Sequence, residues 1–364
     1  MSQLLTPARV SSPGRILKRE LDARGWTQKD LAEIIGRPHQ AINAIVNGNK
    51  QITPKTAIEL AEALGTSAEL WTNLESNYRL HLARQNSEHS SEDSEIARKS
   101  HLYSFAPVPE MTKRGWLADA ESIEQLENQV CHFYGISHLQ ETPQLAVSCR
   151  QSESKTPETS AQMAWVKRVE NIVREQTVPK FDRDRLKAVL PKILSYASVP
   201  SDVELVSEEL RSLGIHFVLL PQLSKTFLDG AAFYLEDNPV IALTLRYDRI
   251  DHFWFTLMHE IAHIAAGHKG GYLDNMDDLE VNKEELEANQ LAADWLLSER
   301  ELMSFVRSTK PYFSEQKVLS FAESQQRHAG IVVGRLQRDG ELSYKNLNKL
   351  KVKVKRYLTG QMYQ

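Results

Sequence analysis

Residues Phe253–His268, FWFTLMHEIAHIAAGH, contain the side chains whose types and spacing could perform chemistry. In a helix, His259 and His263 lie one turn apart on the same face, so both imidazoles could bind one Zn²⁺ ion at about 2.0–2.1 Å. Glu260 lies beside them, where it could accept a proton from water that the metal activates. Apolar residues cover most of this segment's circumference, which predicts a buried helix that ends at Gly267.

A zinc site of this kind needs a third protein ligand, and the next predicted helix, EELEANQLAADWLL at 284–297, supplies candidates. Glu287 is the favoured candidate, because it follows His263 by 24 residues, enough for a loop and an antiparallel return of the second helix. Glu284 and Asp294 share a helical face with Glu287 and remain alternatives. His268 is a further alternative, although its spacing after HExxH is one residue short of the metzincin pattern.

The composition is that of an ordinary protein with two or three domains: 364 residues, 41% hydrophobic and 25% charged, with a formal net charge of −4. Residues 1–85 contain 11 Lys and Arg against 8 Asp and Glu, so this part carries +3 and the remainder −7. The asymmetry fits a nucleic-acid-binding head on a mildly acidic body. The two cysteines, Cys131 and Cys149, exclude a disulfide framework or a cysteine-based zinc cage. Without a long apolar run or a signal peptide, the chain is expected to be soluble and cytoplasmic, with no membrane partner.

The N-terminal part predicts a helix-turn-helix. Thr27 is placed to cap a helix with Asp30 in the capping-box position. Counted from Gln28, the fifth residue is Ala32, the ninth is Gly36 and the fifteenth is Ile42. These residues allow a close helix crossing, a turn and an inward apolar contact under the recognition helix.

The outward face of the predicted recognition helix, HQAINAIVNG, is rich in amides that can read adenine edges in the major groove. Basic residues flank it as candidate phosphate contacts, with a glutamine at the adjoining helix start. The predicted DNA contacts are Gln28, Arg37, His39, Gln40, Asn43, Asn47 and Lys50.

Residues 13–85 resemble the XRE-type helix-turn-helix, in particular the HigA branch of antitoxins, over WTQKDLAEIIGRPHQAINAIVNGNKQITPKTAIELAEALG and its flanks. The resemblance implies dimeric binding to a palindromic double-stranded DNA operator and autorepression, with a toxin as a possible partner.

The remaining chain predicts three further segments. Residues 86–100 are polar and Ser/Glu-rich, which indicates a flexible linker. Residues 101–200 are predicted as a helical connector. Residues 201–364 predict an α+β domain, in which a helix, three short strands and the HExxH helix follow one another and the polar segment 270–279 forms a loop.

The pair FWFTLMHEIAHIAAGH and ELEANQLAADWLL resembles the ImmA/IrrE metallopeptidase family. By position, the resemblance implies a zincin-like domain with one Zn²⁺ ion, His259, His263 and Glu287 as ligands and Glu260 as general base. Leu291 and the pair Leu297-Ser298 depart from the family pattern, at positions that affect packing.

The predicted protein is a DNA-binding transcriptional regulator with a zinc endopeptidase that hydrolyses a specific protein, such as a repressor-type partner. The alternative is a HigA-like antitoxin or autorepressor whose peptidase-like body docks or senses a partner without proteolysis. An oxyanion donor is also required, and Tyr247, His268, Tyr272 and His328 remain open as candidates.

Overall fold

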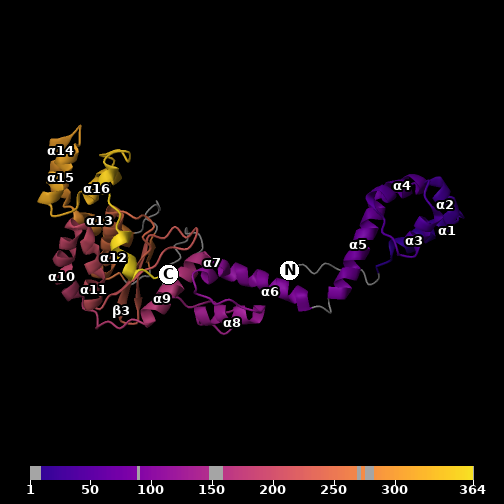
Figure 1. Cartoon of the computed structure of the whole chain (residues 1–364), viewed down its shortest axis with the longest axis horizontal. Coiled ribbons are helices and arrows are strands. Elements are labelled where there is room, and N and C mark those ends of the chain that lie inside the picture. Colours follow the sequence, from indigo (N-terminus) through magenta and orange to yellow (C-terminus); the bar gives the residue numbers. More distant parts are fainter. Residues whose placement is uncertain (1–9, 88–90, 147–158, 269–271, 275–282, 364) are drawn as a thin grey trace. The chain divides into compact units, whose positions relative to one another are not determined.

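The computed structural model describes residues 10–87, 91–146, 159–268, 272–274 and 283–363. The chain divides into two compact units, residues 1–99 and 100–364. Figure 1 shows the elements in chain order by colour and labels helices α1 to α16 and strand β3. In the described part of the chain, no helix has both the length and the apolar composition needed to cross a membrane.

The first unit is all-α, and its helices begin and end close to the predicted positions: α1 (Pro13–Arg24), α2 (Gln28–Ile34), α3 (His39–Val46), α4 (Pro54–Leu64) and α5 (Ala68–Ser87). Thr27 and Asp30 form the predicted capping box at the start of α2. Gly36 adopts the left-handed φ of 65° that the turn requires. Ala32 and Ile42 are buried in the core of this unit, so the local packing expected of a helix-turn-helix is confirmed.

Helix α6 (Ser91–Phe105) crosses the boundary between the two units. In the described part of the second unit, the helices that follow are α7 (Val108–Lys113), α8 (Ile123–Tyr134), α9 (Ser160–Arg174), α10 (Arg183–Ser195), α11 (Val206–Ser212), α12 (Ile250–Ala266), α13 (Lys283–Leu296), α14 (Glu299–Thr309), α15 (Glu315–Ser324), α16 (Ala329–Arg338) and α17 (Lys355–Leu358). The strands are β1 (His216–Leu219), β2 (Gly230–Leu235), β3 (Asn238–Leu243) and β4 (Tyr272–Asp274). The chain is thus multidomain, with an all-α head and an α+β body, as predicted.

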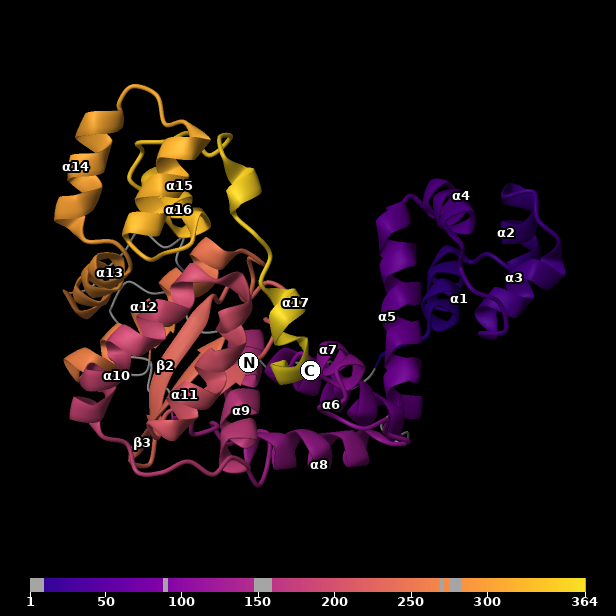
Figure 2. The same cartoon turned by 60° about the vertical axis from the view of Figure 1, so that its left-hand side comes forward.

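The sheet has the order β1-β3-β2-β4, and side chains of β1 and β3 are buried on both of its faces. β1 runs parallel to β3, whereas β2 is antiparallel to both β3 and β4. Because side chains alternate along a strand, Val240 and Ala242 of β3 join one core and Ile241 and Leu243 join the other. The first core contains α9, and the second contains α12, so the HExxH helix lies on one face of the sheet (Figure 2).

Two predicted segments have a different structure from the one expected. The predicted linker is mostly helical, since α5 extends to Ser87 and α6 begins at Ser91. Residues 96–100 are exposed on α6. The predicted connector is not a unit of its own. Its helix α9 packs on the sheet, where the Trp165 indole donates a hydrogen bond to the Leu220 carbonyl oxygen at 3.0 Å.

The predicted loop at 270–279 contains a strand. β4 pairs with β2, with Ala231 opposite Leu273, and thereby adds a fourth strand to the three expected. A three-residue edge strand is too short to give a period-two pattern in the sequence. The rest of 270–279 lies outside the described residues.

A buried ion pair in α9 supplies a stability prediction. Lys167 Nζ lies 3.0 Å from Glu170 Oε2, and both residues are buried. Replacing Lys167 with Met leaves the carboxylate buried without its cation, so we expect the free energy of unfolding to fall by about 3–5 kcal/mol. Urea denaturation measures this change. Lys99→Met, which removes an exposed pair with Glu95, should change stability little, and equal losses in the two variants would contradict the prediction.

Candidate metal centre and DNA-binding face

Helix α12 presents the HExxH residues to the interior of the second unit. His259, Glu260 and His263 are each at most 1% exposed. The helix ends at Gly267, which has the left-handed φ of 81° predicted for its C-cap. The sheet on one side and α13 on the other cover the helix, so the three polar side chains lie in a dry environment.

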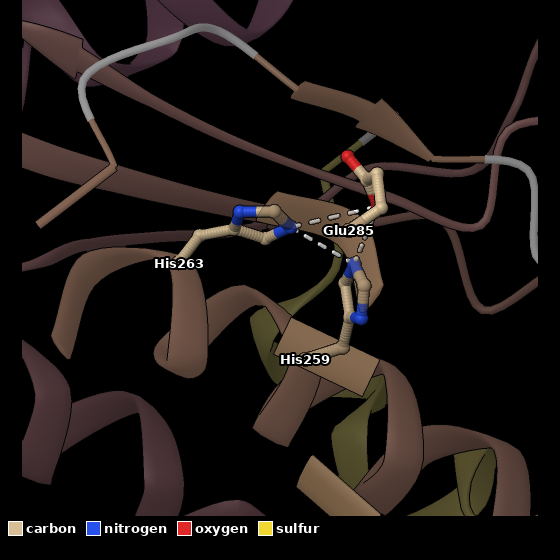
Figure 3. A group of neighbouring side chains, drawn as sticks. All are labelled: His259, His263 and Glu285. Atoms are coloured by element: carbon tan, nitrogen blue, oxygen red, sulfur yellow. Dashed lines mark hydrogen bonds and ion pairs between the residues drawn. The ribbon is translucent and has the colours of Figure 1, made fainter. Parts of the chain in front are cut away.

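The two imidazoles meet one carboxylate, that of Glu285 in α13 (Figure 3). His259 Nε2 lies 3.0 Å from His263 Nε2, and Glu285 Oε2 lies 3.3 Å and 3.7 Å from these nitrogens. Ligand atoms around a tetrahedral Zn²⁺ at 2.0–2.1 Å are separated by about 3.3 Å. The three atoms therefore form a triangle of the size that one such ion requires, and the donor set of two nitrogens and one oxygen suits zinc.

The electrostatics of Glu285 also suit a cation. Burial raises the pKa of its carboxyl, but hydrogen bonds and charge interactions with His259 and His263 together outweigh burial and hold the pKa below its usual range. The carboxylate is consequently anionic at neutral pH.

The prediction that Glu287 would complete this cluster is corrected by the structure. Residues two apart on a helix point in nearly opposite directions, so when Glu285 faces the histidines Glu287 faces away. The side chain of Glu287 is 59% exposed, against 14% for Glu285. The alternatives also lie elsewhere: Asp294 accepts a hydrogen bond from the Glu299 backbone N–H at the start of α14. Glu284 is not part of the cluster.

A signal for Glu285 was present in the sequence. Ala288, Ala292 and Leu296 follow it at spacings of three, seven and eleven, and all three are buried. They mark the face of α13 that packs against α12. A carboxylate on the small-residue face of the second helix is the one that reaches the histidines.

His268 and Glu287 form a second layer behind the cluster. His263 Nδ1 lies 3.0 Å from His268 Nδ1, and His268 Nε2 lies 3.5 Å from Glu287 Oε2. The nitrogen of His263 that faces away from the cluster is thus bound to another imidazole, which is in turn bound to a carboxylate. Such outer contacts fix the ring orientation of a metal-binding histidine.

Glu260 is fully buried, and the backbone of β2 makes room for its carboxylate. A Cβ atom built on Gly230 would lie 2.2 Å from Glu260 Oε1 and 3.0 Å from Thr256 Cγ2. Any side chain at this position would therefore displace the carboxylate. The close approach of the Glu260 carboxylate to β2 therefore requires glycine at position 230, the first residue of this strand.

The candidate oxyanion donors are dispersed. His268 is the second-layer residue just described. His328 caps α16, where its Nδ1 accepts a hydrogen bond from the Gly330 backbone N–H. Tyr247 packs edge-on against His252, at the start of α12. Tyr272 is in β4, and its side chain lies outside the described part of the chain.

The predicted DNA-binding face is exposed on α3. His39, Gln40, Asn43 and Asn47 are exposed, and Asn47 Nδ2 donates a hydrogen bond to Asn43 Oδ1 at 3.0 Å. Lys50, just after α3, is also exposed, and Gln28 is the first residue of α2. Arg37 differs from the rest, because its guanidinium forms an ion pair with Glu59, which competes with a phosphate contact.

The amides of α3 give a DNA-binding prediction. We expect the double variant Gln40→Ala, Asn43→Ala to lose its preference for the operator over random DNA, because alanine cannot hydrogen-bond to base edges. Each amide contributes about 1–3 kcal/mol of discrimination. Competition binding assays measure the preference, and circular dichroism should show unchanged helicity. An unchanged preference would reject α3 as the recognition helix.

Comparisons with known proteins agree with this division of the chain. A helix-turn-helix family model matches residues 17–71, and the model of an IrrE N-terminal-like domain, a peptidase family, matches residues 212–313. Antitoxin HigA-1 of Vibrio cholerae is 39% identical over 71 residues, which is 19% of this chain and 67% of that protein. Virulence-associated protein I of Dichelobacter nodosus is 35% identical over 74 residues, 20% of this chain and 68% of that protein.

A solved structure of the Pseudomonas aeruginosa antitoxin HigA with the higBA promoter is 31% identical; it covers 23% of this chain and 94% of that one, with a TM-score of 0.23. On the two family models and the identity to Antitoxin HigA-1, the chain belongs to the XRE-type helix-turn-helix family, with HigA antitoxins as homologues of its N-terminal unit, and its C-terminal unit carries an IrrE N-terminal-like domain of a metallopeptidase family.

Proposed function

We propose that this protein is an operator-binding transcriptional regulator whose second unit is a zinc-dependent endopeptidase with a specific protein substrate. The observation that carries the peptidase half is the triangle of His259 Nε2, His263 Nε2 and Glu285 Oε2, with donor atoms all within 4.8 Å of one another. The buried carboxylate of Glu260 belongs to the same turn of α12. The helix-turn-helix and its HigA homologues support the DNA-binding half.

The residues have separate roles in this proposal. His259, His263 and Glu285 hold the ion, and a bound Zn²⁺ polarises the scissile carbonyl and makes water more acidic. Glu260 accepts the proton of the attacking water and delivers it to the leaving amine. His268 and Glu287 hold the His263 ring in orientation. Because Glu260 is fully buried, its proton transfers take place away from bulk solvent.

The substrate we propose is a repressor-type protein partner, or the DNA-binding half of the chain itself. The head is proposed to bind double-stranded operator DNA as a homodimer. The similarity of residues in the head to Antitoxin HigA-1 favours one alternative, an antitoxin or autorepressor that binds a toxin and whose second unit docks partners without proteolysis.

The test separates metal binding from cleavage. The full-length protein and its Glu260→Gln variant are loaded with zinc, metal content is measured, and cleavage of the chain itself and of candidate repressors is followed by mass spectrometry. We expect the variant to keep its zinc while cleavage falls by about 10²–10⁴-fold, the usual contribution of a general base. Glu301→Gln, an exposed carboxylate of α14, is the matched control and should cleave like the parent. Zinc-loaded parent protein that cleaves none of these substrates would favour the antitoxin alternative.

A further inference from the structure

A cavity of about 310 Å³ lies beside the N-terminal half of α12, outside the His259–His263–Glu285 cluster. Its walls come from α12, α13 and α16 and from the segments before α12 and after α16. Its size is at the lower end of the range for small-molecule sites. The lining combines aromatic rings, four cationic side chains and one acidic residue: Tyr247, Arg249, Asp251, His252, Phe255, Ala293, Leu296, Leu297, Ile331, Gly334, Arg335, Arg338, Tyr344 and Lys351.

Three of the four cations in this cavity already have a carboxylate. Asp251 Oδ1 lies 3.2 Å from Arg249 Nε, and Asp251 Oδ2 lies 3.1 Å from Lys351 Nζ. Arg335 forms ion pairs at 2.8 Å with Asp339 and with Glu299. Taken together, these three cations pair with three carboxylates, so their charges balance in total.

Arg338 is the exception. Among the described residues its guanidinium forms no ion pair; it contacts the Asn289 side-chain carbonyl oxygen at 3.4 Å and lies over the Phe255 ring, 4.2 Å from the ring centroid. Arg338 is exposed at the rim of the cavity, so its guanidinium is accessible to a ligand. Partial desolvation and the neighbouring Arg335 lower the pKa of Arg338, and the charges of Asp339 and Tyr344 partly offset this shift. The guanidinium is planar and keeps its charge, and its stacking on Phe255 holds it in a fixed plane.

We propose that this cavity binds a small organic anion in which an aromatic ring carries a phosphate or carboxylate group. The anionic group would pair with Arg338, where a planar fork of donors matches two oxygens. The ring would lie among Tyr247, Tyr344 and the apolar side chains of α13. In small-molecule sites, aromatic walls typically bury the ligand and a few convergent charged groups fix its orientation.

The same cavity is connected to the metal centre through Arg338. Phe255 precedes His259 by one helical turn, and their ring centroids lie 6.4 Å apart. Asn289 follows Glu285 by one turn of α13. An anion that draws the guanidinium towards itself alters its contacts with both helices that supply the cluster, so the ligand is an effector of the metal site. This second half of the inference rests on the proposed function, whereas ligand binding does not.

The binding test uses phenyl phosphate and benzoate as probes, titrated calorimetrically into the metal-free full-length protein. Inorganic phosphate and phenol are the comparison ligands, each with only half of the proposed features. We expect at least one of the two probes to bind, about tenfold or more tightly than either comparison ligand. Arg338→Gln should weaken binding by about ten- to 100-fold, because it removes a charge-assisted pair. Arg338→Lys should restore part of the affinity.

The control variant is Arg300→Gln, which removes an exposed arginine of α14 that does not line the cavity and should bind like the parent. Circular dichroism checks that each variant is folded. No binding of either probe, or equal binding by the parent and Arg338→Gln, overturns the proposal. Equal affinity for inorganic phosphate and phenyl phosphate overturns the assignment of the ring.

Coupling is measured separately, as zinc affinity with and without a saturating probe, by competition with a chromophoric chelator. We expect a change of at least threefold, and linkage requires the same change in probe affinity when zinc is bound. Probe binding without any change in zinc affinity overturns the effector role. Probe binding by a protein that binds no zinc would instead reject the proposed function and leave the anion site standing.

Discussion

Glu285→Gln is expected to lower zinc affinity by more than about 100-fold. This loss exceeds the roughly 10- to 100-fold loss that is typical when a residue that only contacts a metal ligand is replaced. The carboxylate is the only acidic group within reach of both imidazoles in the described part of the chain. An amide keeps the shape of the side chain but lacks the negative charge that the ion requires. Competition with a chromophoric chelator at fixed pH measures the affinity.

Glu287→Gln is the matched variant, since it makes the same chemical change two residues away. Its carboxylate is mostly exposed and, among the residues that the structure describes, pairs with His268 alone, so we expect a loss of less than about tenfold. His268→Ala should fall between the two, at about 10- to 100-fold, because it removes the contact that orients His263. Greater loss in Glu287→Gln than in Glu285→Gln would restore the prediction made from the sequence and reject the geometry described above.

Gly230→Ala is expected to reduce peptidase activity by about 10²-fold or more while zinc stays bound. The new methyl group would occupy the space of Glu260 Oε1, and misplacing a reacting group by about 1 Å costs roughly that factor. The three atoms nearest to this methyl group belong to Glu260 and Thr256 and not to the three cluster residues, so metal content should be unchanged. The measurements are turnover of a cleaved substrate and zinc content on the same preparation.

Gly360→Ala is the control for this change, because a Cβ at Gly360 meets no atom within 4 Å. It should retain both activity and zinc. If Gly230→Ala were as active as the parent, the carboxylate would not need its observed position, and Glu260 would be rejected as the general base. Loss of zinc together with activity would indicate a general disturbance of α12.

Much of the fold near the two functional sites follows from short-range rules. Thr27, Ala32, Gly36 and Ile42 predicted the helix-turn-helix because caps, turns and crossing contacts depend on neighbours along one short segment. His259 and His263 were placed together by helical geometry alone. The strands β1 to β3 were likewise visible from β-rich runs between turn residues.

The segments between these parts were less predictable. The polar composition of residues 86–100 indicated a linker, yet residues 91–100 form most of α6, since polar residues are compatible with a solvated helix. The helix α9 has a buried face whose partner, the sheet, lies more than forty residues further along the chain. No local pattern specifies such a partner.

The sequence by itself determined that this protein has a DNA-binding head and a body with a two-histidine, one-glutamate helix, because residue type and helical period are sufficient for both. Only the tertiary structure decided which carboxylate joins the histidines. Glu285 and Glu287 lie on the same helix and differ in the direction in which their side chains point from its axis. The rotation of α13 about this axis is set by packing of its small-residue face against α12. Packing also placed Arg338 between Phe255 and Asn289, a contact among three helices that spacing along the chain could not predict.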